Sequence, residues 1–155
     1  YYHKYSEEQK ANAGAYNYEG DFNPEFHFGF GLSYTTFAYS NMKVDKTSLP
    51  KDSNESINIT IDVTNIGNVE GKEAVQLYSS DLYASIIPDM IRLRRFEKVS
   101  LKPGETKTVS FNLTLNDLSF INLENERVIE TGEFELKVGA SSSDIKKKIL
   151  IKITD

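Results

Sequence analysis

The sequence contains no cysteine and no tryptophan, and only two of its 155 residues are histidine. Without cysteine the chain can form neither a disulfide nor a thiolate metal site. The two histidines, His3 and His27, supply fewer ligands than zinc requires, so we expect no metal. The absence of cysteine leaves the compartment open, because a domain with an adequate core needs no disulfide even outside the cell.

No apolar run is long enough to span a bilayer, and the net charge is -5. The acidic balance argues against a nucleic-acid partner, which needs a basic surface. The two basic clusters, at 92–95 and 146–148, are interpreted as solvated strand faces. No glycine-rich phosphate loop is present either, so no cofactor is predicted. The first residue is Tyr1 and not methionine, and we expect the chain to be part of a longer polypeptide.

Residues 1–34 differ from the rest of the chain. They contain six tyrosines, several glycine or proline turn signals and no sustained period. We interpret them as a linker or arm from a preceding domain, whose aromatic side chains need a surface to cover them. A disordered tail is the alternative, because chain termini are often poorly ordered.

From residue 35 onward, apolar and polar residues alternate with a period of two, which predicts strands with one buried and one solvated face. Such strands need a second sheet to cover them, so residues 35–155 are predicted to form an antiparallel β-sandwich of about seven strands. Most phenylalanines fall on the apolar phase and are expected in the core. The segments that carry this pattern are 37–44, expected at a sheet edge, then 57–64, 75–78, 109–115, 134–138 and 149–153.

The segment 81–91 has no alternation and is predicted to be a long loop. It leads into a kinked strand with a bulge near Phe96. The loop contains Ile86, Ile87 and Met90, whose exposure to water would be costly. We therefore expect these side chains to pack on the domain itself, on an upstream domain or on a second copy of the chain.

Seven short motifs occur in an order that resembles one known family. They are Phe28-Gly-Phe-Gly-Leu-Ser-Tyr-Thr35, Asn65-Ile-Gly67, Glu70-Gly-Lys-Glu73, Val75-Gln-Leu-Tyr78, Leu93-Arg-Arg-Phe-Glu-Lys98, Leu101-Lys-Pro-Gly-Glu-Thr106 and Asp117-Leu-Ser-Phe120. Together they resemble the C-terminal fibronectin III-like module of family 3 glycoside hydrolases of the β-glucosidase type. The resemblance covers about residues 28–140. Arg95 stands where this family commonly has glycine, and Phe30 where it has tyrosine.

The resemblance implies an immunoglobulin or fibronectin III-like sandwich and a parent that hydrolyses β-glycosidic bonds with retention. The two carboxylates of such an enzyme, about 5 Å apart, lie on preceding domains, so no catalytic residue is assigned here. It places the segment around Gly29 at the junction with those domains. We therefore predict interdomain contact for Phe28, Phe30 and Tyr34, with Ile86, Ile87 and Met90 as further candidates. A periplasmic or secreted parent is favoured, and a cytoplasmic one stays open.

The sequence allows three functions. The first is a catalytically silent accessory domain that stabilises or positions the catalytic domains of a hydrolase. The second is a carbohydrate-binding module, for which Tyr78 and Tyr83 are the platform candidates, although core or interface packing is the favoured role for them. The third is a stand-alone structural or adhesion sandwich, and a homodimer is open in each case. Nothing marks a carboxylate pair in an apolar pocket, and Asp62 is interpreted as a solubilising residue on a strand face.

Overall fold

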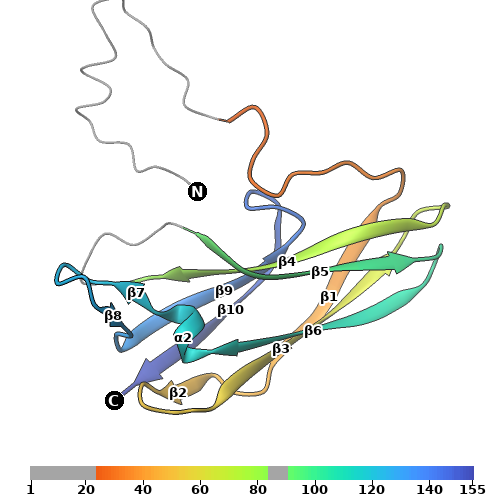
Figure 1. Ribbon diagram of the computed structural model, residues 1–155. Coiled ribbons are helices and arrows are strands. Elements are labelled where there is room, and N and C mark those ends of the chain that lie inside the picture. Colours follow the sequence, from red (N-terminus) through yellow and green to blue (C-terminus); the bar gives the residue numbers. More distant parts are fainter. Residues whose placement is uncertain (1–23, 84–90) are drawn as a thin grey trace, which may run out of the picture.

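The computed structural model describes residues 24–83 and 91–155, and its regular elements are strands apart from the one-turn helix α2 (Figure 1). In chain order the elements are β1 (Phe37–Val44), β2 (Ser48–Pro50), β3 (Ser56–Asn65), β4 (Gly71–Asp81), β5 (Arg92–Leu101), β6 (Thr106–Thr114), α2 (Leu115–Leu118), β7 (Phe120–Ile121), β8 (Arg127–Val128), β9 (Gly132–Gly139) and β10 (Ile145–Thr154).

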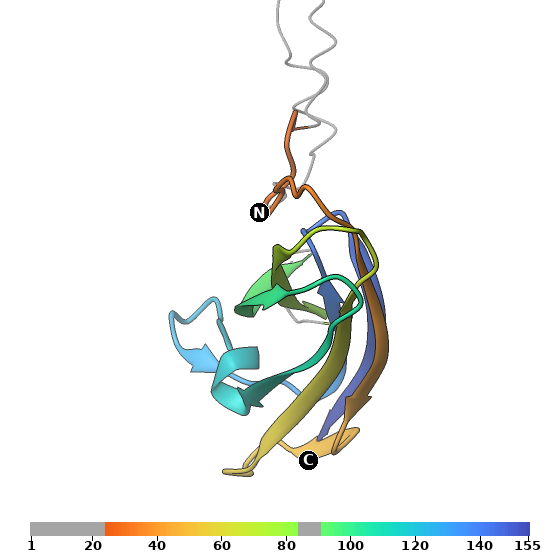
Figure 2. The same cartoon turned by 90° about the vertical axis from the view of Figure 1, so that its right-hand side faces the viewer.

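The strands form two main sheets, one with the order β1-β3-β6 and one with the order β2-β10-β9-β4-β5. Seven long strands make up these layers, which confirms the predicted sandwich, and β1 lies at a sheet edge as expected. The short strands β7 and β8 pair with each other and stand to one side of the sandwich together with α2 (Figure 2).

One pairing departs from the predicted antiparallel order, because β2 runs parallel to β10. The chain leaves β1 in one layer and joins the other layer, where Leu49 is buried in the core. Burial of this side chain accounts for a strand of only three residues that sequence periodicity did not predict.

The core lies between the layers and is built from the alternating residues that the period of two selected. On β3 every second residue, from Ile57 to Asn65, is buried, and β6 and β9 show the same alternation. These three strands each bury one face against the opposite sheet, where removal of apolar surface from water stabilises the fold. The largest fully buried side chains of this core are Leu49, Ile57, Ile59, Ile61, Leu77, Leu101, Leu113, Leu136, Ile151 and Ile153, together with Phe134.

The predicted bulge is present in β5, but it falls at Arg94, two residues before Phe96. Leu77 pairs with Arg95 and Tyr78 with Leu93, so Arg94 is the extra residue of the β4–β5 ladder. The bulge leaves Phe96 on the outer face of the sheet. The expectation that most phenylalanines are in the core is therefore wrong for the described residues. Phe111 and Phe134 are buried, whereas those exposed are Phe26, Phe28, Phe30 and Phe96.

The helix α2 is the second element that periodicity missed, because a single turn is too short to show a helical period. Asp117 accepts hydrogen bonds from the backbone N–H and the hydroxyl of Thr114, at 2.8 and 2.9 Å. These bonds satisfy a donor that the start of a helix leaves unpaired. Leu115 and Leu118 on the same turn are buried in the core, so the turn closes one end of the sandwich.

Candidate interdomain surface

The described part of the predicted arm, residues 24–34, carries an apolar side chain at every second position. All five are exposed to solvent, and Tyr34 is fully exposed. The rings of Phe26 and Phe30 also pack on each other, with centroids 5.1 Å apart. Exposed apolar groups in such a concentration are typical of a surface that another protein surface covers. The five are Phe26, Phe28, Phe30, Leu32 and Tyr34.

Three of the six predicted contact residues, Phe28, Phe30 and Tyr34, therefore lie on the arm and are exposed to solvent. The other three, Ile86, Ile87 and Met90, lie outside the described residues. Ile91, which follows them, is buried. Contact of these side chains with another domain stays a prediction, and so does the boundary of the arm at residue 34.

Gln76 of β4 fastens the arm to the outer face of the five-stranded sheet. Its side chain is buried, and its Nε2 donates hydrogen bonds to the carbonyls of Gly29, at 3.1 Å, and Ala140, at 2.5 Å. The Oε1 of Gln76 accepts a hydrogen bond from the hydroxyl of Tyr78. One residue before Gly29, the carbonyl of Phe28 accepts a hydrogen bond of 2.9 Å from the backbone N–H at 142. The arm is thus bound through its backbone.

Asn65, at the end of β3, anchors the point where the arm enters the sandwich. This asparagine is completely buried, and its side chain makes four hydrogen bonds. Nδ2 donates to the carbonyls of Val69 and Leu101, and Oδ1 accepts from the hydroxyl of Thr35 and the N–H of Gly67. A Cβ at Gly67 would lie 2.2 Å from the Thr35 hydroxyl, which explains the glycine. Three of the family motifs meet at this residue.

Sequence reasoning missed Phe96 as a surface residue. It pairs with Gln76 in the β4–β5 ladder, so both side chains lie on the outer face that the arm crosses. Phe96 is 68% exposed, and it extends the apolar surface beyond the arm. The available signal was the break in periodicity of β5, because the residues on either side of Phe96 are charged and no alternation places it in the core.

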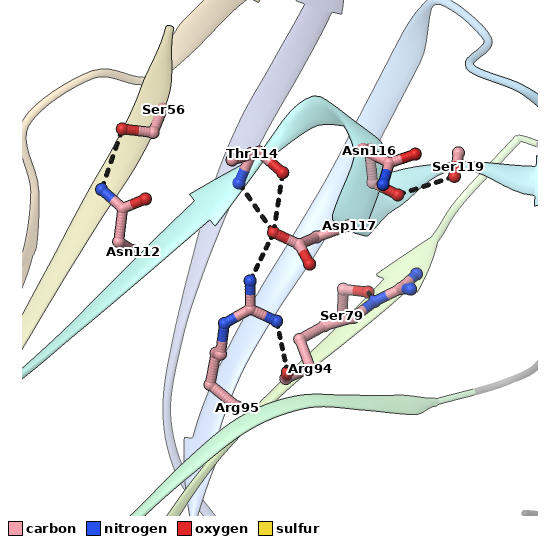
Figure 3. A network of polar contacts seen from close by, with 9 residues as sticks. All are labelled: Ser56, Ser79, Arg94, Arg95, Asn112, Thr114, Asn116, Asp117 and Ser119. Carbon is pink, nitrogen blue, oxygen red and sulfur yellow. Dashed lines mark hydrogen bonds and ion pairs between the residues drawn. The ribbon is translucent and has the colours of Figure 1, made fainter.

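Arg95, the departure from the family pattern, makes an ion pair that joins β5 to α2 (Figure 3). Its guanidinium donates to Oδ2 of Asp117 at 2.6 Å. Arg94, the bulged residue, donates to the hydroxyl of Ser79 at 2.7 Å. Partial burial opposes ionisation of Asp117, but the N–H of Thr114 and the Arg95 guanidinium outweigh it and hold its pKa below the ordinary aspartate value.

Replacing Arg95 with glycine is expected to lower the free energy of unfolding by about 1 kcal/mol, because the Arg95 side chain is 41% exposed and water screens the pair. The lowered pKa of Asp117 fixes the sign of the pH dependence. The pair stabilises the fold above the aspartate pKa of the unfolded chain, and this contribution is lost as pH falls through the lower folded value. The difference between wild type and variant should therefore shrink below about pH 4.

Urea denaturation of the wild type and of Arg95→Gly across this pH range measures the effect, with Asp117→Asn completing a double-mutant cycle. A difference that persists unchanged in acid would assign the loss to the backbone entropy of glycine, which does not titrate, and would contradict the ion-pair account.

Two carboxyls among the described residues have a raised pKa, and both have a structural explanation. Burial raises the pKa of Glu73, and the hydroxyl of Tyr39 donates to its Oε1 at 2.7 Å. Burial also raises the pKa of Asp81, which accepts from the N–H of Tyr83. Asp62 bonds to exposed polar groups on the outer face of β3, as its interpretation as a solubilising residue requires. Tyr78 is completely buried, so it is no platform for a sugar, whereas Tyr83 is exposed.

Across the described ranges, 24–83 and 91–155, no group of three or more histidine, aspartate or glutamate side chains is arranged to hold a metal ion. In the same residues, no helix has the length and hydropathy needed to cross a bilayer.

The domain is a two-layer β-sandwich with an apolar arm fixed to one face, and comparison with known proteins specifies its kind. Residues 73–142 match the family described as "Fibronectin type III-like domain". A β-xylosidase of Formosa agariphila is 46% identical over 129 residues, and thermostable β-glucosidase B of Acetivibrio thermocellus is 42% identical over 131 residues. The matches cover 83% and 84% of this chain and 17% of each relative.

Solved structures give the same result. A β-glucosidase from Listeria innocua in complex with glucose superposes with a TM-score of 0.82 at 32% identity, over 97% of this chain and 21% of that one. For β-glucosidase 3B from Thermotoga neapolitana in complex with glucose, the TM-score is 0.77 at 35% identity, over 86% of this chain and 18% of that one. The chain belongs to the fibronectin III-like domains of family 3 glycoside hydrolases and spans about a sixth of the length of the curated relatives named above.

Proposed function

We propose that this chain is the non-catalytic accessory domain of a β-glucosidase-type hydrolase and that it stabilises or positions the catalytic domains. The observation that carries the proposal is that residues of the family motifs have structural roles. The buried Asn65 and Gln76 serve to build the sandwich and to attach the arm, and the matching part is a small fraction of each relative. In the parent we expect hydrolysis of β-linked glucosides or related sugars with retention, by two carboxylates that lie outside this domain.

The chain alone is expected to show no turnover of an aryl β-glucoside or β-xyloside above the buffer rate. The reason is that acid–base catalysis needs a matched carboxylate pair, and the raised pKa values of Glu73 and Asp81 follow from their burial, with each carboxyl accepting a local hydrogen bond. Release of the aryl alcohol, followed by absorbance, measures this. The intact parent assayed at the same molar concentration is the positive control. Turnover by the chain that disappears in a Glu73→Gln variant would contradict the proposal.

The occupants that compete for the apolar surface are a second copy of the chain and a carbohydrate. Sedimentation of the chain alone is expected to give a monomer, because the natural cover of the arm is the rest of the parent. Titration with gluco- and xylo-oligosaccharides is expected to leave the amide resonances around Tyr34 and Tyr83 unchanged. A concentration-dependent dimer supports pairing of copies, and perturbation of these resonances at millimolar sugar supports a binding module; either result counts against the proposal.

A further inference from the structure

We propose that Gln76 is a positioning residue, which clamps the arm at Gly29 so that its apolar side chains form one outward-facing interaction surface. The occupant of that surface is the part of the same polypeptide that lies upstream of the arm. The identity of the occupant rests on the proposed function, whereas the clamp itself rests only on the geometry of this chain.

The chemistry of the clamp requires a glutamine. The two hydrogen bonds from Nε2 go to carbonyl oxygens, one on the arm at Gly29 and one on the β9–β10 loop at Ala140. Only an amide side chain of this length presents two donors to those acceptors and one acceptor to the Tyr78 hydroxyl. Glutamate has the same shape but would place a carboxylate against two carbonyl oxygens, which is repulsive in a buried site.

The arm in turn requires glycine at position 29. Its φ is +80°, in the left-handed region that disfavours other residues. A Cβ built at Gly29 would also lie 2.1 Å from the Oε1 of Gln76, well inside contact distance. Gly31, two residues further on, has no heavy atom within 4 Å of such a Cβ. The requirement for glycine is therefore local to the clamp.

The stretch of the arm that carries the last three of its outward side chains is fixed at both ends. The clamp holds Gly29, and at the other end the hydroxyl of Thr35 donates to Oδ1 of Asn65 at 2.7 Å. In Figures 1 and 2 this segment, coloured orange, lies at the opposite end of the sandwich from the C-terminus. Between the two anchors, the side chains of Phe30, Leu32 and Tyr34 are exposed to solvent.

Exposed apolar side chains also flank each anchor. Phe96 lies beside Gln76 on the outer face, and Ile66 and Val69 lie in the loop that the Asn65 side chain closes. Together with the arm they form an apolar surface that a soluble domain would not leave uncovered. The charged residues that dominate the rest of the exposed surface are scarce here, since Glu25 and His27 are the only ionisable residues between 24 and 34 apart from Tyr34.

An upstream segment of the same polypeptide is the occupant that these features favour. The curated relatives are about six times longer than the part that matches this chain. Covalent attachment gives a neighbouring domain a high effective concentration at the arm, so a modest apolar surface is enough to hold the two together. A backbone clamp then sets the direction in which the arm leaves the sandwich and thereby the placement of the domain.

The clamp is tested in this chain by Gly29→Ala, with Gly31→Ala as the matched control, because both changes lie in the exposed arm and leave the core intact. Hydrogen exchange at the N–H of residue 142 and at the side-chain amide of Gln76 is the readout. In Gly29→Ala we expect exchange to become at least about tenfold faster while the urea midpoint stays unchanged, since only a local opening is made easier. Gly31→Ala should match the wild type. Unchanged exchange in Gly29→Ala would overturn the clamp.

Gln76→Glu disrupts the same contact from the sandwich side. The variant should make the arm accessible to cleavage by chymotrypsin after Phe28 and Phe30. Faster cleavage there than in the wild type is expected, and a cleavage rate equal to that of the wild type in a folded variant would also overturn the clamp.

The occupant is tested separately by comparing exchange of the backbone amides of 30–34 in this chain and in the full-length polypeptide. Stronger protection in the full-length protein is expected, and equal exchange overturns the occupant while leaving the clamp standing. Neither result depends on whether the parent is a glycosidase, which the turnover assay decides.

Discussion

Replacing Asn65 with alanine is expected to lower the free energy of unfolding by about 3 kcal/mol or more, through the loss of partners for several buried polar groups. The side chain satisfies the carbonyls of Val69 and Leu101 and the donors of Thr35 and Gly67 at a fully buried position. Alanine leaves these groups unpaired in an environment that water reaches poorly. Urea denaturation monitored by circular dichroism measures the loss as a shift of the midpoint at constant slope.

Asn112→Ala is the matched control for this prediction. Asn112 is exposed on the outer face of β6, and its Nδ2 makes one hydrogen bond of 2.8 Å, to the Ser56 hydroxyl. Water replaces this bond in the variant, so the change should be within about 0.5 kcal/mol. Equal losses in the two variants would mean that Asn65 is not the junction described above.

Replacing Phe134 with alanine is expected to cost about 3–5 kcal/mol, because a large side chain leaves a cavity that the packed layers fill only in part. Phe134 lies on β9 and is 2% exposed between the two sheets. The same substitution at Phe96, which is 68% exposed on β5, should change the stability of this chain by less than about 0.5 kcal/mol. Chemical denaturation of both variants compares the same change on the two faces of one sheet.

The result for Phe96 also discriminates between core and surface roles for a residue that the family motifs include. A loss at Phe96 as large as that at Phe134 would show that this side chain is buried in solution and would remove it from the apolar surface. No loss in this chain, combined with looser attachment of the domain in the full-length protein, would assign it to the surface.

Sequence periodicity predicted most of the sandwich, because a strand with one buried face repeats its apolar residues at every second position. Ile57 to Val63 and Phe134 to Val138 are cases in which the pattern and the burial coincide. The pattern failed where few residues carry it. The three residues of β2 and the single turn of α2 are too short for a period, and their places depend on the burial of Leu49, Leu115 and Leu118 against distant strands.

The candidate surface was only partly predictable. The alternation of apolar residues from Phe28 to Tyr34 is visible in the sequence, but the same alternation also describes a strand with a buried face. Hydrogen bonds with Gln76 and Asn65, which lie 47 and 30 positions away in the sequence, anchor this segment at Gly29 and at Thr35. Whether the segment forms a strand with a buried face or an exposed arm therefore depends on long-range contacts. Such contacts also determine that Phe96 faces outward and that Tyr78 is buried.

The central claim is that this domain contributes to the hydrolase through the surface of its arm and not through chemistry of its own. The most direct measurement is the half-life of glycosidase activity of the intact parent on heating, with and without the double change Phe30→Ser and Tyr34→Ser. Because both side chains are exposed in this chain, its own stability should be unaffected, and we predict that the half-life of the parent falls several-fold. A parent that loses activity at the wild-type rate with both side chains replaced would contradict the account.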